Sequence, residues 1–74
     1  MNKPLDPAKL QILTEDAISL REAAQELPRP VSSSTIYRWA LRGVRGRKLE
    51  TVHIGAQIIT SRQAMTRFLA AIND

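Results

Sequence analysis

The most informative part of the sequence is residues 31–43, VSSSTIYRWALRG. Ser32 directly precedes a helical pattern, and its hydroxyl can accept a hydrogen bond from a free amide of the first helical turn. Gly43 suits the left-handed backbone conformation that commonly ends a helix. We therefore predict a helix from Ser33 to Arg42, with a cap at one end and a glycine just past the other.

The two faces of this helix differ in chemistry. With 3.6 residues per turn, Ile36, Trp39 and Ala40 share one face, which we expect to pack into the core. Because the indole lies on that apolar face, it is better explained as a core residue than as a platform for stacking bases. The opposite face is polar, aromatic and basic, and it comprises Ser34, Tyr37, Arg38 and Leu41, with Arg42 on its flank.

A shorter helix is predicted just before this one. Residues 19–22, SLRE, form a capping box, in which a serine hydroxyl and a glutamate carboxylate each accept a hydrogen bond from a free amide. Pro28 ends the helix, and Pro30 keeps the connection extended. The apolar stripe of the helix consists of Leu20, Ala23, Ala24 and Leu27. Two short helices joined in this way form a helix-turn-helix, whose second helix enters the major groove of DNA.

The segment that follows has the pattern of a β-hairpin and a last helix. Residues 49–54 alternate apolar and polar side chains, and residues 57–60 return as a second strand. Gly55-Ala56 between them suits a type II′ turn. Residues 60–63, TSRQ, match a second capping box. The helix after it has an apolar stripe of Met65, Phe68, Leu69 and Ile72.

The predicted fold is mainly α with a small β-hairpin. We expect a winged helix-turn-helix, in the order helix, helix, two-stranded wing, helix. Asp6 and Pro7 can also begin a short extra helix that runs to about Leu13, because proline is tolerated at the first helical position. We accordingly divide the chain into an N-terminal arm or short helix over residues 1–17 and a DNA-binding domain over residues 18–74.

Length and composition limit what the chain can be. Its 74 residues, of which 43% are hydrophobic, suffice for one domain with one core and leave little for a deep substrate pocket. The absence of cysteine excludes disulfides and thiol chemistry. No apolar run approaches the roughly 18 residues of a membrane span, and the N-terminus lacks the apolar core of a signal peptide. We expect a cytoplasmic protein that is associated with the nucleoid.

Positive charge is concentrated in one part of the sequence. The net charge is +4 and the sequence pI is about 10.4. Residues 1–28 contain three basic and five acidic residues, whereas residues 29–74 contain eight basic and two acidic ones. Such an uneven distribution favours a polyanionic partner, although a solubilising surface would have the same composition.

These patterns locate candidate DNA contacts on the second helix and just after it. Ser33 and Ser34 are short enough to let the backbone approach a groove closely, and Arg38 can meet the O6/N7 pair of guanine. The candidates for base contacts are Ser33, Ser34, Tyr37 and Arg38, and those for phosphate contacts are Arg42, Arg45, Arg47, Lys48 and Arg62. Phosphate contacts raise affinity without reading sequence, so we expect the two sets to differ in effect.

Two stretches of the chain resemble the MerR-like and excisionase class of winged helices: SLREAAQELP with VSSSTIYRWALRGVRG, and LETVHIGAQIITSRQAMTRFL. The chain is closer still to a small bacterial family of unknown function that shares STxYRWALRGVRG and TSRxAxxRF. The resemblance implies a DNA-binding fold with a regulatory or recombination-accessory role. MerR regulators continue into a long dimerisation helix and an effector domain, whereas this sequence stops at Asp74. We therefore expect no small-molecule effector, and of the two roles the excisionase-like one fits this length better.

Other chemistry has little support in the sequence. His53 is the single histidine and no cysteine accompanies it, so we expect neither a metal site nor a cofactor. The serines at 32–34 lack a base and an orienting acid, which favours capping and phosphate contact over nucleophilic catalysis. Glu15 and Asp16 are adjacent acids of the kind that favour the start of a helix. We expect no enzymatic activity.

The expected partner is double-stranded DNA. One domain of this size covers few base pairs, so we expect a homodimer or a partner protein on an adjacent site. The alternative is a protein-interaction adaptor, such as an antitoxin, that uses the same fold and turns its basic loop over residues 44–48 toward an acidic protein. An exposed apolar patch around Leu41 and the last helix would favour that alternative. No membrane association is expected.

Overall fold

A computed structural model describes residues 7–73. This stretch contains four helices and three strands: α1 (Pro7–Leu13), β1 (Ala17–Ser19), α2 (Leu20–Glu26), α3 (Ser33–Leu41), β2 (Val52–Ile54), β3 (Gln57–Ser61) and α4 (Arg62–Ile72). The short helix predicted from Pro7 to Leu13 agrees with α1. Its expected cap, Asp6, lies outside the described residues.

The three strands form one antiparallel sheet in the order β1-β3-β2. On one edge of β3, Ile58 lies opposite His53 of β2, and on the other edge Thr60 lies opposite Ile18 of β1. The expected two-stranded hairpin is present, but the sheet has a third strand that we did not predict. Because β1 is only three residues long, it is too short for a pattern of alternating side chains to indicate it.

The turn between β2 and β3 has the expected geometry. Gly55 has a φ of 60°, and among the described non-glycine residues only Arg45 has a positive φ, so Ala56 does not. A positive φ at the first central residue alone is what a type II′ turn requires. β2 begins at Val52 rather than Leu49, since Leu49 instead donates its amide to the carbonyl of Trp39 at 3.0 Å.

α2 and α3 begin at the caps that the sequence predicts. The hydroxyl of Ser19 accepts a hydrogen bond from the Glu22 amide at 3.0 Å, and the Glu22 carboxylate accepts one from the Ser19 amide at 3.2 Å. The Ser32 hydroxyl accepts one from the Thr35 amide at 3.2 Å. α3 ends at Leu41, one residue before the predicted end.

The start of α4 differs from the prediction. Its cap is Ser61, whose hydroxyl accepts a hydrogen bond from the Ala64 amide at 2.8 Å. Thr60, the cap expected from the TSRQ pattern, is fully buried and donates its hydroxyl to the Glu50 carbonyl at 2.8 Å. Gln63 binds Asp16 instead of completing a capping box. The cap predicted at Thr60 was therefore wrong by one residue, because β3 continues through Ser61.

The apolar faces of the helices meet in one core. Ile36 of α3 is fully buried, as expected. Trp39 is half-buried, and its ring centroid lies 5.2 Å from that of Phe68, with the rings tilted by 35°. The prediction that Trp39 packs into the core is confirmed. α1 also contributes to this core, because Ile12 has no exposed surface.

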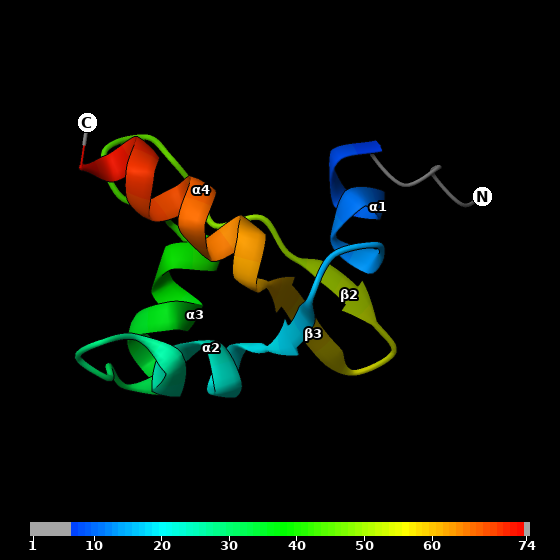
Figure 1. Ribbon diagram of the computed structural model, residues 1–74, viewed down its shortest axis with the longest axis horizontal. Helices are drawn as coiled ribbons and strands as arrows, with labels where there is room; N and C mark the ends of the chain where they lie inside the picture. Colours follow the sequence, from blue (N-terminus) through cyan, green and yellow to red (C-terminus); the bar gives the residue numbers. More distant parts are fainter. Residues whose placement is uncertain (1–6, 74) are drawn as a thin grey trace.

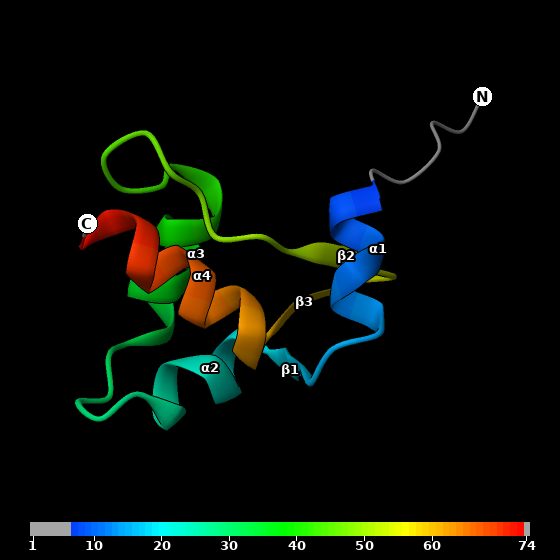
Figure 2. The ribbon, with the colours of Figure 1, turned by 45° about the horizontal axis from the view of Figure 1, so that its top comes forward.

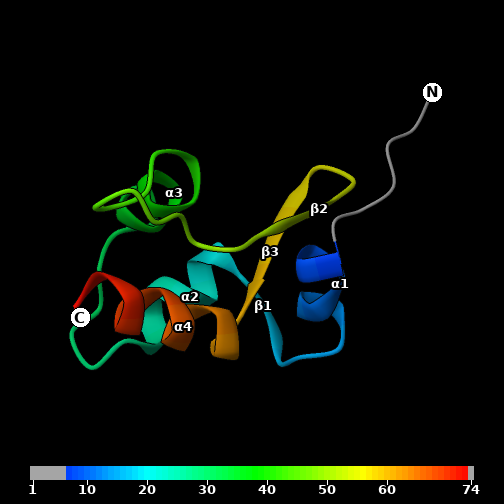
Figure 3. The same cartoon turned by 90° about the horizontal axis from the view of Figure 1, so that it is seen from above.

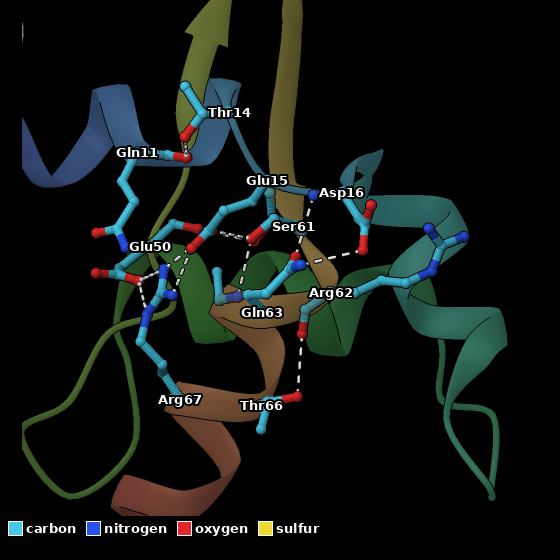
Figure 4. Close-up of polar contacts among 12 residues, drawn as sticks. Gln11, Thr14, Glu15, Asp16, Glu50, Ser61, Arg62, Gln63, Thr66 and Arg67 are labelled. Carbon is cyan, nitrogen blue, oxygen red and sulfur yellow. Dashed lines mark hydrogen bonds and ion pairs between the residues drawn. The ribbon is translucent and has the colours of Figure 1, made fainter.

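The segment between α1 and β1 is tied to the start of α4. The Glu15 carboxylate accepts a hydrogen bond from the Ser61 hydroxyl at 2.6 Å and one from Arg67 at 2.7 Å (Figure 4). The Asp16 carbonyl accepts a hydrogen bond from the Arg62 amide at 3.1 Å. Glu15 and Asp16 therefore lie at the start of a helix. That helix is α4, whose cap, Ser61, follows Glu15 by 46 residues.

The four described helices are divided between the two ends of the sheet. α1 lies against the β2–β3 hairpin, while α2, α3 and α4 lie together at the other end of the sheet (Figures 1 and 2). Seen from above, α3 and the β2–β3 turn both lie along the upper edge, with α2 and α4 below them (Figure 3). The second helix of the predicted helix-turn-helix and the tip of the hairpin therefore face the same side.

Candidate nucleic-acid interface

The outward side of α3 forms an open depression. It is lined by Ser33, Ser34, Tyr37, Arg38, Leu41 and Arg42. The four residues proposed from sequence to contact bases are thus brought together, and one of the proposed phosphate contacts lies beside them. Leu41, which was not among the predicted DNA contacts, belongs to the same depression and is 61% exposed.

The internal packing of α3 fixes which side chains face outward. Because Ile36 and Trp39 pack into the core, the opposite face of α3, which carries Tyr37 and Arg38, is exposed. Tyr37 is 44% exposed, so it is neither buried in the core nor fully open to solvent. At the N-terminal end, Ser32 caps the helix and the positive end of the helix dipole faces outward beside Ser33 and Ser34.

A tight turn over residues 44–47 holds the next group of cations. Val44 and Arg47 exchange two backbone hydrogen bonds, of 2.7 and 2.9 Å. Arg45 and Gly46 have φ values of 52° and 77°, which define a type I′ turn. We predicted a basic loop here without a defined turn; the glycine at the second central position was the available signal for one. The exposed cations of this segment are Arg45, Arg47 and Lys48.

Gly43 joins α3 to this turn at very close range. Its φ is 80°, as expected for the residue after a helix end. A Cβ at this position would lie 2.1 Å from the backbone carbonyl oxygen of Arg47. The turn can fold back onto the end of α3 only because residue 43 has no side chain.

Arg45 differs from the other cations of the turn. Its guanidinium donates a hydrogen bond to the Ile72 carbonyl at 3.2 Å, at the C-terminal end of α4. A cation there is stabilised by the negative end of the helix dipole. Arg42, Arg47 and Lys48 have no ion pair within residues 7–73. Of the proposed phosphate contacts, these three are therefore the least engaged inside the protein.

Arg62 lies elsewhere on the molecule. Its guanidinium donates two hydrogen bonds to the Glu26 carboxylate, at 2.7 and 2.8 Å. It lines a groove between α2 and α4 together with Leu27 and Met65, not the depression on α3. These hydrogen bonds raise the pKa of Arg62 and lower that of Glu26 relative to their ordinary values. A side chain held in this way is poorly placed to bind a phosphate.

The acidic side chains pair away from the α3 face. Residues 31–48 contain five basic residues and no acidic one. Glu15 and Glu50 both bind Arg67 (Figure 4). The hydrogen bonds from Arg67, then from Ser61, hold the pKa of the Glu15 carboxyl below its ordinary value, and those from Glu15 and Glu50 raise the pKa of Arg67. Consequently the positive charge of α3 and the turn is not offset within its own segment.

The rest of the described chain offers no grouping of side chains that would suit a metal ion. Within residues 7–73, no three His, Cys, Asp or Glu side chains are grouped as a metal site would require. His53 is exposed on β2. Within the same stretch, no helix combines the length and the apolar character needed to cross a bilayer.

Within residues 7–73, the fold is mixed, with four helices, a three-stranded antiparallel sheet and a cationic helical face. Residues 19–73 match the family described as "Protein of unknown function (DUF1580)", and the chain belongs to this family. The matched residues begin at the cap of α2 and include α3, the basic turn, the hairpin and α4. The comparisons with curated proteins and with solved structures found no match.

Proposed function

We propose that this chain binds double-stranded DNA without catalysing a reaction. It does so as a winged helix-turn-helix, in the role of a small transcription regulator or an excisionase-like recombination accessory factor. The observation that carries the proposal is the depression on α3, where Ser33, Ser34, Tyr37 and Arg38 are gathered beside the cationic turn. A single exposed helix with short polar residues at its start and cations at its flank fits a major groove about 12 Å wide.

The arrangement of the elements supports this proposal. α2 and α3 are joined by a short connection, and the β2–β3 turn projects on the same side as α3 (Figure 3). The third strand pairs with β3 away from this turn, so it leaves the hairpin tip free. The tip, Gly55-Ala56, is uncharged and would approach the DNA backbone without reading bases.

The two groups of side chains have separate roles in this proposal. Arg38 reads a guanine, with Tyr37 reaching a phosphate or a thymine methyl group and Ser33 and Ser34 allowing close approach. Arg42, Arg47 and Lys48 hold phosphates, with Arg45 as a fourth contact if it exchanges its bond to Ile72 for one to DNA. Arg62 is left out, because it is bound to Glu26.

Selection from random duplexes tests the proposal. The protein is incubated with a pool of random double-stranded DNA, and bound duplexes are recovered by gel shift, amplified and sequenced. We expect one sequence to be enriched. With about four phosphates neutralised, log K should fall with log salt at a slope of about −4. If no duplex is bound even at low salt, the proposal is refuted.

A protein-interaction adaptor is the second candidate, and one observation favours it. The groove between α2 and α4 is lined largely by apolar side chains, including Leu27, Met65 and Leu69. It lies apart from the cationic face, so both could be used at once. Leu27→Ser at this groove should leave DNA binding unchanged, whereas an adaptor would lose its partner in a pull-down. Absence of DNA binding together with such a loss would favour the adaptor.

A further inference from the structure

One apolar side chain of the α3 depression has no part in the contacts proposed so far. Leu41 is 61% exposed and lines the depression with Tyr37, Arg38 and Arg42. An isolated exposed leucine is common on protein surfaces and would need no explanation. This one lies among the side chains that face DNA in the proposed function, so its chemistry should matter there.

The charge around Leu41 restricts what can cover it. Residues 31–48 carry five cations and no acid, and two of these cations, Arg38 and Arg42, line the same depression. An apolar protein surface would bury these cations without a counter-charge, which is costly. A DNA major groove supplies the counter-charge, and the apolar group it presents is the 5-methyl group of thymine.

The spacing on the helix predicts where such a contact would fall. Leu41 follows Arg38 by three residues and Tyr37 by four, so the three side chains share one face of α3. Three residues advance about 4.5 Å along a helix axis. Base pairs rise about 3.4 Å, so two side chains at this spacing reach bases one or two pairs apart.

We infer that Leu41 is a specificity-determining residue, which contacts the methyl group of a thymine one or two base pairs from the guanine read by Arg38. This inference rests on the proposed function and names one feature of the DNA that it binds. It requires no contact by Leu41 within the protein, in agreement with its exposure.

Replacement of thymine by deoxyuridine tests the inference, because it removes only the methyl group. Each thymine of the selected duplex is replaced singly, and binding is measured for the wild type and for Leu41→Ala. At one position, loss of the methyl group should weaken wild-type binding about fourfold, the value expected for one buried methyl group. Leu41→Ala should bind the unmodified duplex more weakly by a similar factor and should not respond to the replacement. Leu41→Met should retain the response.

The possible results separate this inference from the proposed function. The inference is overturned, and DNA binding stands, if the wild type binds a selected duplex but no replacement weakens that binding. It is also overturned if the replacement weakens binding by Leu41→Ala as much as binding by the wild type. A selected site without thymine within two pairs of the contacted guanine overturns it as well. If no duplex is bound at all, the proposed function fails and takes the inference with it. Thermal melting confirms that each variant is folded.

Discussion

Individual side chains on the cationic face should contribute to DNA binding in two distinguishable ways. Arg38 lies in the α3 depression, whereas Arg47 lies in the turn beside it. Arg38→Ala should cost about 1–3 kcal/mol on the selected duplex and blur one base position, since in the proposed complex it removes a contact to a base. Arg47→Ala, the matched control, should weaken selected and scrambled duplexes alike. Equal losses of Arg38→Ala on both duplexes in titrations would contradict its reading role.

A second prediction at this scale concerns the two glycines around the basic turn. Both have left-handed φ values, 80° for Gly43 and 77° for Gly46, but only Gly43 would bring a Cβ against the backbone. Gly46→Ala should cost about 1–2 kcal/mol of unfolding free energy, the ordinary cost of a left-handed L-residue. Gly43→Ala should cost more, because the Arg47 carbonyl must move. Urea unfolding of both variants measures the difference, and equal stability would contradict the close approach.

At the scale of elements, the cap of α4 should matter more than that of α3. Ser61 is fully buried, accepts a hydrogen bond from the Ala64 amide and donates one to Glu15. Ser61→Ala should therefore cost about 1–3 kcal/mol, because it leaves buried polar groups without a partner. Ser32→Ala at the exposed cap of α3 should cost about 1 kcal/mol. Thermal unfolding that ranks the two in the opposite order would contradict this.

The elements also show what sequence patterns can and cannot predict. The caps at Ser19 and Ser32, the buried face of α3 and the hairpin turn at Gly55 all follow from local spacing, and the structure confirms them. The cap of α4 was misplaced by one residue, because Ser61 is both the last residue of β3 and the cap of α4. β1 was missed, because its partner residues are 40 or more positions away.

The candidate site was predictable to a similar degree. The helical period was enough to gather the residues of the α3 depression, since all of them lie in α3 or directly after its last residue. It could not indicate that Arg62 is held by Glu26 or that Arg45 is bound to the end of α4. Both interactions join residues at least 27 positions apart, and no local pattern encodes such a separation.

At the scale of the whole molecule, the interaction of Glu15 with Arg67 and Ser61 should make stability depend on pH. The pKa of Glu15 is lowered from its ordinary value of 4.5, so the folded state binds its proton less readily than the unfolded state. This contribution is complete above pH 4.5 and is lost as the pH falls through the lowered pKa. Wild type and Glu15→Gln should therefore differ in unfolding free energy at pH 7, and this difference should shrink as the pH is lowered below 4.5. A difference that is constant with pH would contradict this origin.

The short strand β1 has a consequence for any shortened form of this protein. It covers one edge of β3, where Ala17 and Ile18 lie opposite Ser61 and Thr60. A polypeptide beginning at residue 19, where the family match starts, would leave that edge with unpaired amides and carbonyls. Free strand edges recruit strands from other molecules. Such a fragment should therefore self-associate more readily than a polypeptide that contains the whole of β1.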